Sequence, residues 1–451
     1  MRKNTLIVLS LAGLSPSLLQ SGDCPALEGY AGKCGGAIPV DPVLPALTLS
    51  MQATLTTGAL PAAHGIVGNG FYDRAHMEQR FWSASSGLVE GPRFWDASGK
   101  KETAPGAPPK VAALFWWNFL GSPIDTYLNV APFHLADGRT IPSCYSKPAG
   151  LYAYLEGKLG PFPLHRFWGP GVSIESSEWI LKATLETAAE RAPDLLFSYL
   201  PHMDYSLQRS GPGSTEAKKH LRELDDLLAP LLEEASSGEK QVVVLSEYGI
   251  GPVSRHLSPN RILREEGLFA LRRLGKAGYP DLVGSRAFAL CDHQVAHIYV
   301  RDPRDRTSVG TLLRSLPGVG NVLTGTEKKK AGIDHPRSGD LVLLSTQDAW
   351  FDYSWWTSPE EAPDYAGTVD IHRKIGYDPL ELILDRAAGG IAGDPRLIRG
   401  SHGLIPEKKA DKPVIITPFL DALYSAVPAE IPATAVATLL MNLLERVAEL
   451  K

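Results

Sequence analysis

The chain has 451 residues, of which 44% are hydrophobic and 21% charged. This length exceeds the roughly 250–300 residues at which one hydrophobic core stops growing, and the composition excludes a collagenous, coiled-coil or largely disordered chain. The net charge of −5 provides no basic field for nucleic acid. We therefore expect more than one structural unit and no nucleic-acid scaffold as a partner.

The N-terminus permits two interpretations. Arg2 and Lys3 followed by the apolar run Leu6–Leu14 resemble a signal peptide, although Pro16 ends the run early. The same run has the Leu, Ile and Val content of a buried strand. We favour the strand and a cytoplasmic protein; export is the alternative if residues 1–22 form a signal peptide. No apolar stretch reaches 18 residues, so no membrane span is predicted.

The cysteines are too few and too scattered for a disulfide framework, and they form no Cys-x-x-Cys pair for a structural zinc site. Cys24 and Cys34 could bridge in an oxidising compartment, but we expect reduced thiols. The four cysteines are Cys24, Cys34, Cys144 and Cys291.

Residues 71–170 are rich in proline and glycine, show little periodicity and contain clustered aromatic residues such as Phe115–Trp117. A second aromatic cluster lies at Trp350–Trp356. We interpret each cluster as core packing of an inserted segment. An aromatic wall over a pocket is the alternative.

Strand and helix signals alternate further along the chain. A helical stretch around Glu178–Glu190 precedes the apolar run Pro193–Leu200. Leucines then recur at helical spacing from Leu221 to Leu232, after Ser214 or Thr215 as the N-cap. The apolar run Gln241–Ser246 reads as another buried strand. Continuously apolar strands separated by a helix predict a parallel sheet covered on both faces.

Four short stretches with polar residues or glycines each follow a predicted strand. They lie at Ala12–Gly13, His202–Asp204, Ser246–Gly249 and Gly400–Gly403. Because ligands of open α/β sheets bind at the carboxyl ends of the strands, we expect these places to meet.

The segment Thr48–Asn69 carries a resemblance. It ends in Thr-Gly-Ala-Leu-Pro-Ala-Ala-His-Gly-Ile-Val-Gly-Asn, and it resembles the type I phosphodiesterase/nucleotide pyrophosphatase branch of the alkaline phosphatase superfamily. Asp204–Pro212, His335–Asp340 and Asp370–Pro379 are also similar to this branch. The resemblance implies a nucleophile at Thr48 and a phosphate-binding amide at Asn69.

The resemblance also implies the fold, which is a doubly wound, mostly parallel α/β sheet between helices with an inserted cap region. We expect an alkaline phosphatase-like core, an aromatic-rich insertion at 71–170 and a cap or insert region at 253–390. The core would comprise residues 1–70, 171–252 and 391–451.

The family's two metal ions are held at positions that correspond here to Ala12, Thr48, Asp204, Gln208, Glu247, Tyr248 and His402. Thr48, Asp204 and His402 keep the family's residue type, whereas Ala12 cannot bind a metal. We therefore expect Asp204, His402 and Glu247 as metal ligands, and Gln208 and Tyr248 as substrate contacts. This donor set suits one Mg, Mn or Ca ion rather than a zinc pair, or no ion at all.

Other residues are candidates for a rebuilt site. His372 lies beside Arg373 and Lys374, and an imidazole next to two cations suits anion binding or acid–base chemistry. We predict a catalytic role for His372 and substrate binding by Arg373 and Lys374. His202, His293 and His297 are further candidates, although we expect His297 to be structural.

The resemblance and its departures favour an enzyme that acts on a small phosphate or diphosphate ester with an altered, at most single-metal site. One alternative is a degenerate member that binds a phosphorylated ligand or partner without catalysis. Another is a non-hydrolytic, diphosphate-eliminating or cyclising enzyme on the same fold. The sequence leaves the oligomeric state open.

Overall fold

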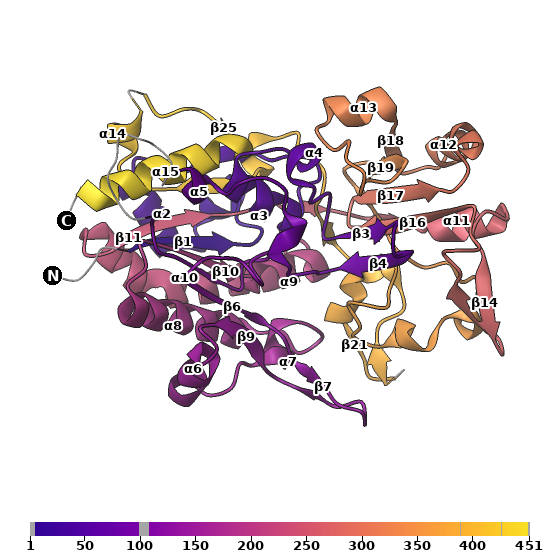
Figure 1. Cartoon of the computed structure of the whole chain (residues 1–451), viewed down its shortest axis with the longest axis horizontal. Helices are drawn as coiled ribbons and strands as arrows, with labels where there is room; N and C mark the ends of the chain where they lie inside the picture. The colour runs from indigo at the N-terminus through magenta and orange to yellow at the C-terminus, as the bar shows by residue number, and fades with distance from the viewer. Residues whose placement is uncertain (1–4, 99–107, 388, 425, 450–451) are drawn as a thin grey trace.

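The computed structural model describes residues 5–98, 108–387, 389–424 and 426–449, and its largest element is a nine-stranded sheet (Figure 1). β1 (Leu6–Leu11) lies in the middle and pairs in parallel with β10 and β11. The strand order across the sheet is β25 (Ile431–Pro432), β2 (Ile38–Asp41), β24 (Val414–Ile416), β11 (Gln241–Leu245), β1, β10 (Leu195–Leu200), β5 (Val111–Leu114), β6 (Thr126–Val130) and β9 (Cys144–Lys147).

Helices cover both faces of this sheet because its strands are apolar on both sides. Ile7, Leu9 and Leu11 of β1 pack into one core, while Leu6 and Val8 pack into the other. The first core contains residues of α2 (Pro25–Lys33), α6 (Leu151–Leu159), α8 (Ile174–Arg191) and α10 (Thr215–Ser236); the second contains residues of α3 (Thr48–Thr57), α5 (Phe94–Ser98) and α15 (Ala433–Glu449). This arrangement confirms the expected doubly wound α/β fold.

The local sequence predictions are confirmed along this core. The apolar N-terminal run forms β1 rather than a helix. The Ser214 hydroxyl accepts a hydrogen bond from the Ala217 N–H and caps α10, whose leucines face the core. Cys24 and Cys34 lie at opposite ends of α2, so nine residues of helix, roughly 13 Å, separate them. Both thiols are free, as are Cys144 and Cys291.

Residues 71–170, expected to form an insertion, contribute β5, β6 and β9 to the central sheet. These strands have only four or five residues each and are separated by glycine- and proline-containing loops, so their periodicity is too short to recognise. The aromatic cluster Phe115–Trp117 of this segment is buried and packs as core: Trp116 contacts Phe197 of β10, with 4.9 Å between ring centroids.

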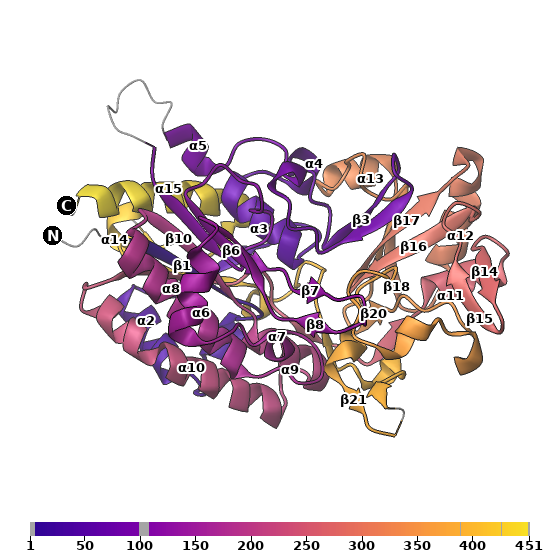
Figure 2. The ribbon, with the colours of Figure 1, turned by 60° about the horizontal axis from the view of Figure 1, so that its bottom comes forward.

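Residues 253–390 contain a separate four-stranded antiparallel sheet, drawn in orange beside the central sheet (Figures 1 and 2). Its strand order is β16 (Ala287–Asp292), β17 (Val295–Val300), β19 (Leu341–Ser345) and β18 (Val319–Leu323). β16 and β17 form a hairpin whose turn contains His293 with a positive φ of 59°. This turn reaches the carboxyl edge of the central sheet, because the N–H of Gln294 donates to the carbonyl oxygen of His402.

None of the helices in the described part of the chain combines the length and apolar character that crossing a bilayer requires.

Candidate active site

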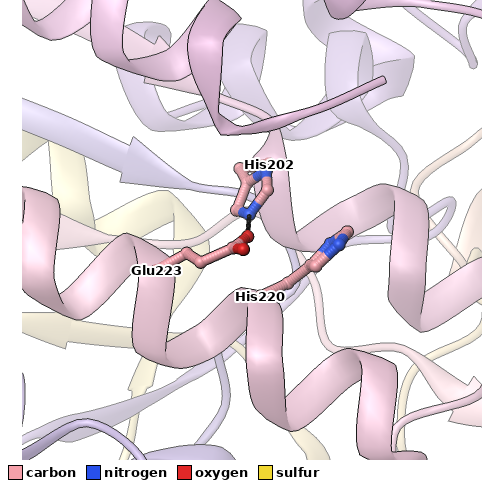
Figure 3. A group of neighbouring side chains, drawn as sticks. All are labelled: His202, His220 and Glu223. Carbon is pink, nitrogen blue, oxygen red and sulfur yellow. Dashed lines mark hydrogen bonds and ion pairs between the residues drawn. The ribbon is translucent and has the colours of Figure 1, made fainter. Parts of the chain in front are cut away.

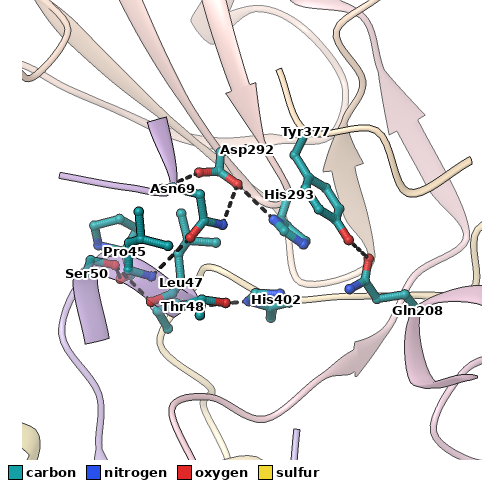
Figure 4. Close-up of polar contacts among 12 residues, drawn as sticks. Pro45, Leu47, Thr48, Ser50, Asn69, Gln208, Asp292, His293, Tyr377 and His402 are labelled. Atoms are coloured by element: carbon teal, nitrogen blue, oxygen red, sulfur yellow. Dashed lines mark hydrogen bonds and ion pairs between the residues drawn. The ribbon is translucent and has the colours of Figure 1, made fainter. Parts of the chain in front are cut away.

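Thr48 is the first residue of α3, and its side chain is buried. The N-terminal N–H groups of a helix have no intrahelical partners and attract anions. The carboxamide oxygen of Asn69 accepts the N–H of Leu49 at 3.1 Å, which places Asn69 directly beside Thr48 at this terminus (Figure 4). The helix start and the amide expected to bind phosphate are therefore adjacent.

His64, the histidine of the same motif, holds this arrangement in place. Its Nδ1 accepts the N–H of Ile66, and its Nε2 lies 3.0 Å from the hydroxyl of Thr54 in α3. Burial lowers the pKa of His64 to about 3, so the ring is neutral. The motif histidine thus connects α3 to the loop that leads to Asn69.

The expected places at the strand ends meet around Thr48. Asp204 and Gln208 lie on α9 (His202–Ser210), which follows β10. Glu247 and Tyr248 follow β11, and His402 follows β23 (Gly400–Ser401). All five side chains are buried. Ala12, at the end of β1, provides only a methyl group.

A chain of hydrogen bonds joins Thr48 to Asp204 through Tyr248. The Tyr248 hydroxyl donates to Oδ1 of Asp204 at 3.1 Å, and Oγ1 of Thr48 lies 3.3 Å from the same hydroxyl. A phenol carries one proton, so Thr48 must be the donor in its contact with Tyr248. The arrangement can therefore move a proton from Thr48 towards Asp204.

The second carboxylate oxygen of Asp204 is also occupied. Nε2 of Gln208 donates to Oδ2 at 2.7 Å, and the Tyr377 hydroxyl donates to the Gln208 amide oxygen at 2.9 Å. Burial raises the pKa of Asp204 to about 6, although the hydrogen bonds from Gln208 and Tyr248 oppose this rise. Neutral donors from the protein therefore surround the carboxylate that the family uses to bind metal.

Four aromatic rings form a continuous stack beside this carboxylate. Tyr248 stacks on His402 with 3.6 Å between ring centroids, His402 lies 3.9 Å from His293, and His293 stacks on Tyr377 at 3.8 Å. The hydroxyls at the two ends of the stack bind Asp204 and Gln208, which bind each other. Stack and hydrogen bonds together form a closed network.

Each of the two imidazoles in the stack, His293 and His402, is hydrogen-bonded through Nδ1, which leaves Nε2 as the nitrogen that could bind a metal. Nδ1 of His402 lies 2.9 Å from the carbonyl oxygen of Ala46, and Nδ1 of His293 lies 2.9 Å from Oδ1 of Asp292 (Figure 4). Burial lowers the pKa of His293 to about 3 and that of His402 well below its usual value, so both rings are neutral. An imidazole fixed in this way through Nδ1 presents the tautomer that binds metals through Nε2.

The donor atoms differ between the two places where the resemblance implies metal ions. Nε2 of His402 lies 4.0 Å from Oδ1 of Asp204, and the buried Nε2 of His293 has no hydrogen-bond partner. Asp204 and His402 are therefore a close pair of donors, and His293 lies beside them through its ring contact with His402. At the second position of the family's metal pair, Ala12 offers no donor atom and Tyr248 donates its proton to Asp204. Neither of these two side chains therefore presents a free metal-donor atom.

Glu247 lies apart from the Asp204 network and faces α3. Its Oε1 accepts Nε2 of Gln52 at 2.8 Å, while its buried Oε2 has no partner. Burial raises the pKa of Glu247 to about 7, with the Gln52 hydrogen bond opposing the shift. A carboxyl group with this pKa is largely neutral in mildly acidic solution, which makes Glu247 a poor metal ligand there.

The structure gives His372, Arg373 and Lys374, predicted from the sequence as catalytic or substrate-binding residues, other contacts than this site. Nζ of Lys374 is buried and donates to Asp378 at 2.8 Å, to Glu381 at 2.6 Å and to the Thr368 carbonyl. Arg373 pairs with Asp370 on the surface, and the exposed His372 lies in the same turn. The ammonium of Lys374 is therefore committed to carboxylates rather than free for phosphate.

The remaining histidine candidates, His202 and His297, lie outside this site. His297 is structural, as expected, because its ring nitrogens contact the Val67 carbonyl and the Gly339 N–H. His202 does not share a face with Asp204 and so does not join this site. Both residues lie in the first turn of α9, where positions two apart point in different directions.

Three contributors were not identified from the sequence as site residues: Asp292, Tyr377 and Gln52. Oδ2 of Asp292 accepts the N–H of Asn69 at 2.8 Å, and its Oδ1 accepts the Asn69 amide at 3.1 Å. Burial raises the pKa of Asp292 to about 6. The sequence offered one signal, the Asp292–His293 pair between two apolar runs. Tyr377 and Gln52 lie within two segments that resemble the family, Asp370–Pro379 and Thr48–Asn69, but their roles depend on tertiary contacts.

The chain thus has a doubly wound α/β fold with a threonine at a helix N-terminus beside the carboxyl ends of its strands. The sequence profile of the type I phosphodiesterase / nucleotide pyrophosphatase family matches residues 6–378, and the chain belongs to this family. Members of the family normally use divalent metal ions.

Relatives agree with this membership. The chain is 25% identical over 382 residues to an uncharacterized pyrophosphatase/phosphodiesterase of Schizosaccharomyces pombe, covering 84% of this chain and 67% of that protein. It is 27% identical to ectonucleotide pyrophosphatase/phosphodiesterase 1 of Saccharomyces cerevisiae over 55% of this chain, but spans only 34% of that protein.

Solved structures share the fold over nearly the whole chain. Phosphonoacetate hydrolase from Sinorhizobium meliloti superposes with a TM-score of 0.62 at 17% identity, covering 99% of this chain and 96% of that one. Murine ectonucleotide pyrophosphatase / phosphodiesterase 5 gives a TM-score of 0.59 at 16% identity, with 98% and 95% coverage.

Proposed function

We propose that this chain hydrolyses a small phosphodiester or diphosphate ester with Thr48 as the nucleophile. The observation that carries the proposal is the hydrogen-bond chain from Thr48 through Tyr248 to Asp204, at the start of α3 beside Asn69. A threonine hydroxyl is a weak nucleophile unless a neighbouring group takes its proton. Here the protein's own side chains provide the path for that proton.

The steps follow from this geometry. The phosphoryl group lies over the N-terminus of α3, where the N–H groups and the Asn69 amide bind its oxygens. Oγ1 of Thr48 attacks phosphorus, the bond to the leaving alcohol or phosphate breaks, and the Thr48 proton passes through Tyr248 to Asp204. Water then attacks phosphorus, the bond between Oγ1 and phosphorus breaks, and the proton on Asp204 returns through Tyr248 to Oγ1, while the proton that water loses leaves with the products.

We further propose that Asp204 and His402 hold a single divalent ion, with His293 as an added ligand that the family's set lacks. The support is the pair of neutral imidazoles whose Nδ1 atoms are engaged and whose Nε2 atoms are available. A mixed carboxylate and imidazole set suits Mn²⁺. A bound ion there would neutralise charge on the transferring phosphoryl group.

Turnover of bis(4-nitrophenyl) phosphate and of a nucleoside diphosphate ester, each with Mg²⁺, Mn²⁺ or Zn²⁺, tests the proposal. We expect Thr48→Ala to abolish hydrolysis and Thr48→Ser to retain part of it, because serine keeps the hydroxyl. Full activity of Thr48→Ala would refute the nucleophile. Incorporation of ¹⁸O from water into the product would distinguish hydrolysis from elimination or cyclisation.

A non-catalytic binding protein is the second candidate. The observation that favours it is Asp204, whose two oxygens already accept protein donors, together with Ala12 at a ligand position. This candidate predicts tight binding of a phosphorylated ligand without turnover under any metal condition. Calorimetric titration with nucleotide, run beside the turnover assay, separates the two.

A further inference from the structure

A second group of metal-binding side chains lies between α9 and α10. His202 is the first residue of α9, while His220 and Glu223 stand three residues apart on α10 and so share one face (Figure 3). His202 points towards α10, whereas Asp204 on the same helix points into the site described above. The two sets of residues therefore have no member in common.

The three side chains converge. Each offers one ligand atom, and these atoms all lie within 4.8 Å of one another. Nε2 of His202 lies 3.1 Å from Oε2 of Glu223, and the two imidazole rings are 4.4 Å apart between centroids. A single ion can be reached from all three residues with small side-chain adjustments, because metal–ligand bonds of about 2.0–2.2 Å span such separations.

The imidazoles have unused nitrogen atoms in a buried place. His202 is fully buried, His220 is 8% exposed, and Nδ1 of each ring has no hydrogen-bond partner. A buried polar atom without a partner costs about 1–3 kcal/mol, so such atoms call for an explanation. Burial lowers the pKa of His202 to about 3 and also lowers that of His220. Burial thus favours the neutral imidazole, the form in which histidine binds metals.

We propose that His202, His220 and Glu223 bind one divalent transition-metal ion of the zinc class. Two imidazoles and one carboxylate form a donor set that zinc and its neighbours in the first transition row prefer over magnesium or calcium. The Glu223 side chain is 32% exposed, so an ion can enter from solvent along that side.

The ion would join the beginning of α9 to α10. Because α9 also carries Asp204 and Gln208, the cross-link would fix the helix that supplies two residues of the active site. Binding to the folded state alone raises thermal stability in proportion to the logarithm of metal concentration over Kd. The site therefore has a signature that does not depend on catalysis.

Zn²⁺ titration of the full, chelator-treated chain tests the proposal, with calorimetry and thermal melting as readouts. We expect one equivalent of Zn²⁺ to be lost, or bound at least tenfold more weakly, in Glu223→Gln and in His220→Ala. Glu234→Gln on the same helix, where Glu234 pairs with Lys240 at the surface, is the matched control. Asp204→Asn should leave this equivalent in place, because it affects only the active-site ion.

Cobalt substitution adds a test of ligand identity. The X-ray absorption spectrum of the Asp204→Asn protein loaded with one Co²⁺ should contain imidazole scattering that weakens in His220→Ala. Three results would each overturn the proposal. The first is unchanged zinc binding in both Glu223→Gln and His220→Ala, and the second is loss of this equivalent in Asp204→Asn. The third is no binding by the wild-type chain at micromolar Zn²⁺. If His220→Ala does not fold, the isosteric Glu223→Gln decides the outcome.

Discussion

The phenol ring of Tyr248 lies flat on the imidazole of His402, with 3.6 Å between the centroids and 8° between the planes. From the resemblance of the sequence, we expected a metal ligand at each of these two positions. In this chain only His402 remains a ligand candidate. Tyr248 uses its ring to pack against that imidazole and its hydroxyl to bind Asp204, so a hydrogen-bond donor stands where a metal–ligand bond is expected.

Tyr248→Phe tests whether that hydroxyl takes part in catalysis. The substitution keeps the stacked ring and removes the oxygen between Thr48 and Asp204. We expect kcat to fall by about 10²–10⁴-fold, the usual contribution of general acid–base catalysis, with a much smaller change in KM. Steady-state kinetics with a phosphodiester substrate provides the measurement.

Tyr30→Phe is the matched control for this experiment. Its hydroxyl is also buried and donates to the Val242 carbonyl, but α2 lies away from Thr48. Loss of that hydrogen bond should cost about 1 kcal/mol of stability and leave kcat unchanged. Equal kinetics for Tyr248→Phe and the wild type would remove Tyr248 from the proposed proton path.

His293→Ala tests the single-ion arrangement. If Nε2 of His293 binds the ion together with Asp204 and His402, its loss should weaken Mn²⁺ binding at this site at least tenfold. The measurement is calorimetric titration with Mn²⁺ of proteins that keep Asp204 and also carry Glu223→Gln, which removes the second proposed site. His76→Ala, which removes an exposed imidazole paired with Asp73, is the control. Unchanged Mn²⁺ affinity in His293→Ala would show that the ion, if bound, does not use this residue.

The sequence could predict the core because its signals are local. The apolar run Leu6–Leu11 and the helically spaced leucines of α10 are both buried. Apolar composition and periodicity are therefore enough to predict these two elements. The motif from Thr48 to Asn69 is also continuous, and its parts meet in the structure as expected. β5, β6 and β9 escaped recognition because each is too short for a period to emerge.

The site could be predicted only in part because two of its residues come from another sheet. Asp292 and His293 reach Asn69 and His402 through a hairpin turn whose position depends on the packing of residues 253–390. The sequence neighbours of Lys374 suggested an anion site, but tertiary contacts supply it with Asp378 and Glu381. Adjacent charges in a sequence do not reveal which partners the fold brings to them.

Lys374→Met tests this structural interpretation of Lys374 against the predicted substrate contact. The substitution leaves Asp378 and Glu381 buried without their cation, and breaking a buried ion pair from one side costs about 3–5 kcal/mol. We therefore expect a large loss of stability in urea denaturation and an unchanged KM for the fraction that remains folded. Arg373→Met, at an exposed ion pair, should cost no more than about 1 kcal/mol. A raised KM in Lys374→Met with full stability would instead support phosphate binding.

The buried histidines make stability depend on pH, and His64 offers the clearest test. Its folded-state pKa is lowered to about 3 from a usual value of 6.5, so below pH 6.5 the unfolded chain binds a proton that the folded chain excludes. Stability must therefore fall as pH falls through this window, by about 1.4 kcal/mol per pH unit for this residue. His64→Gln should reduce the slope of unfolding free energy between pH 6 and pH 4 by that amount, measured by urea denaturation at each pH. An identical slope in His64→Gln and the wild type would mean that His64 is charged in the folded protein.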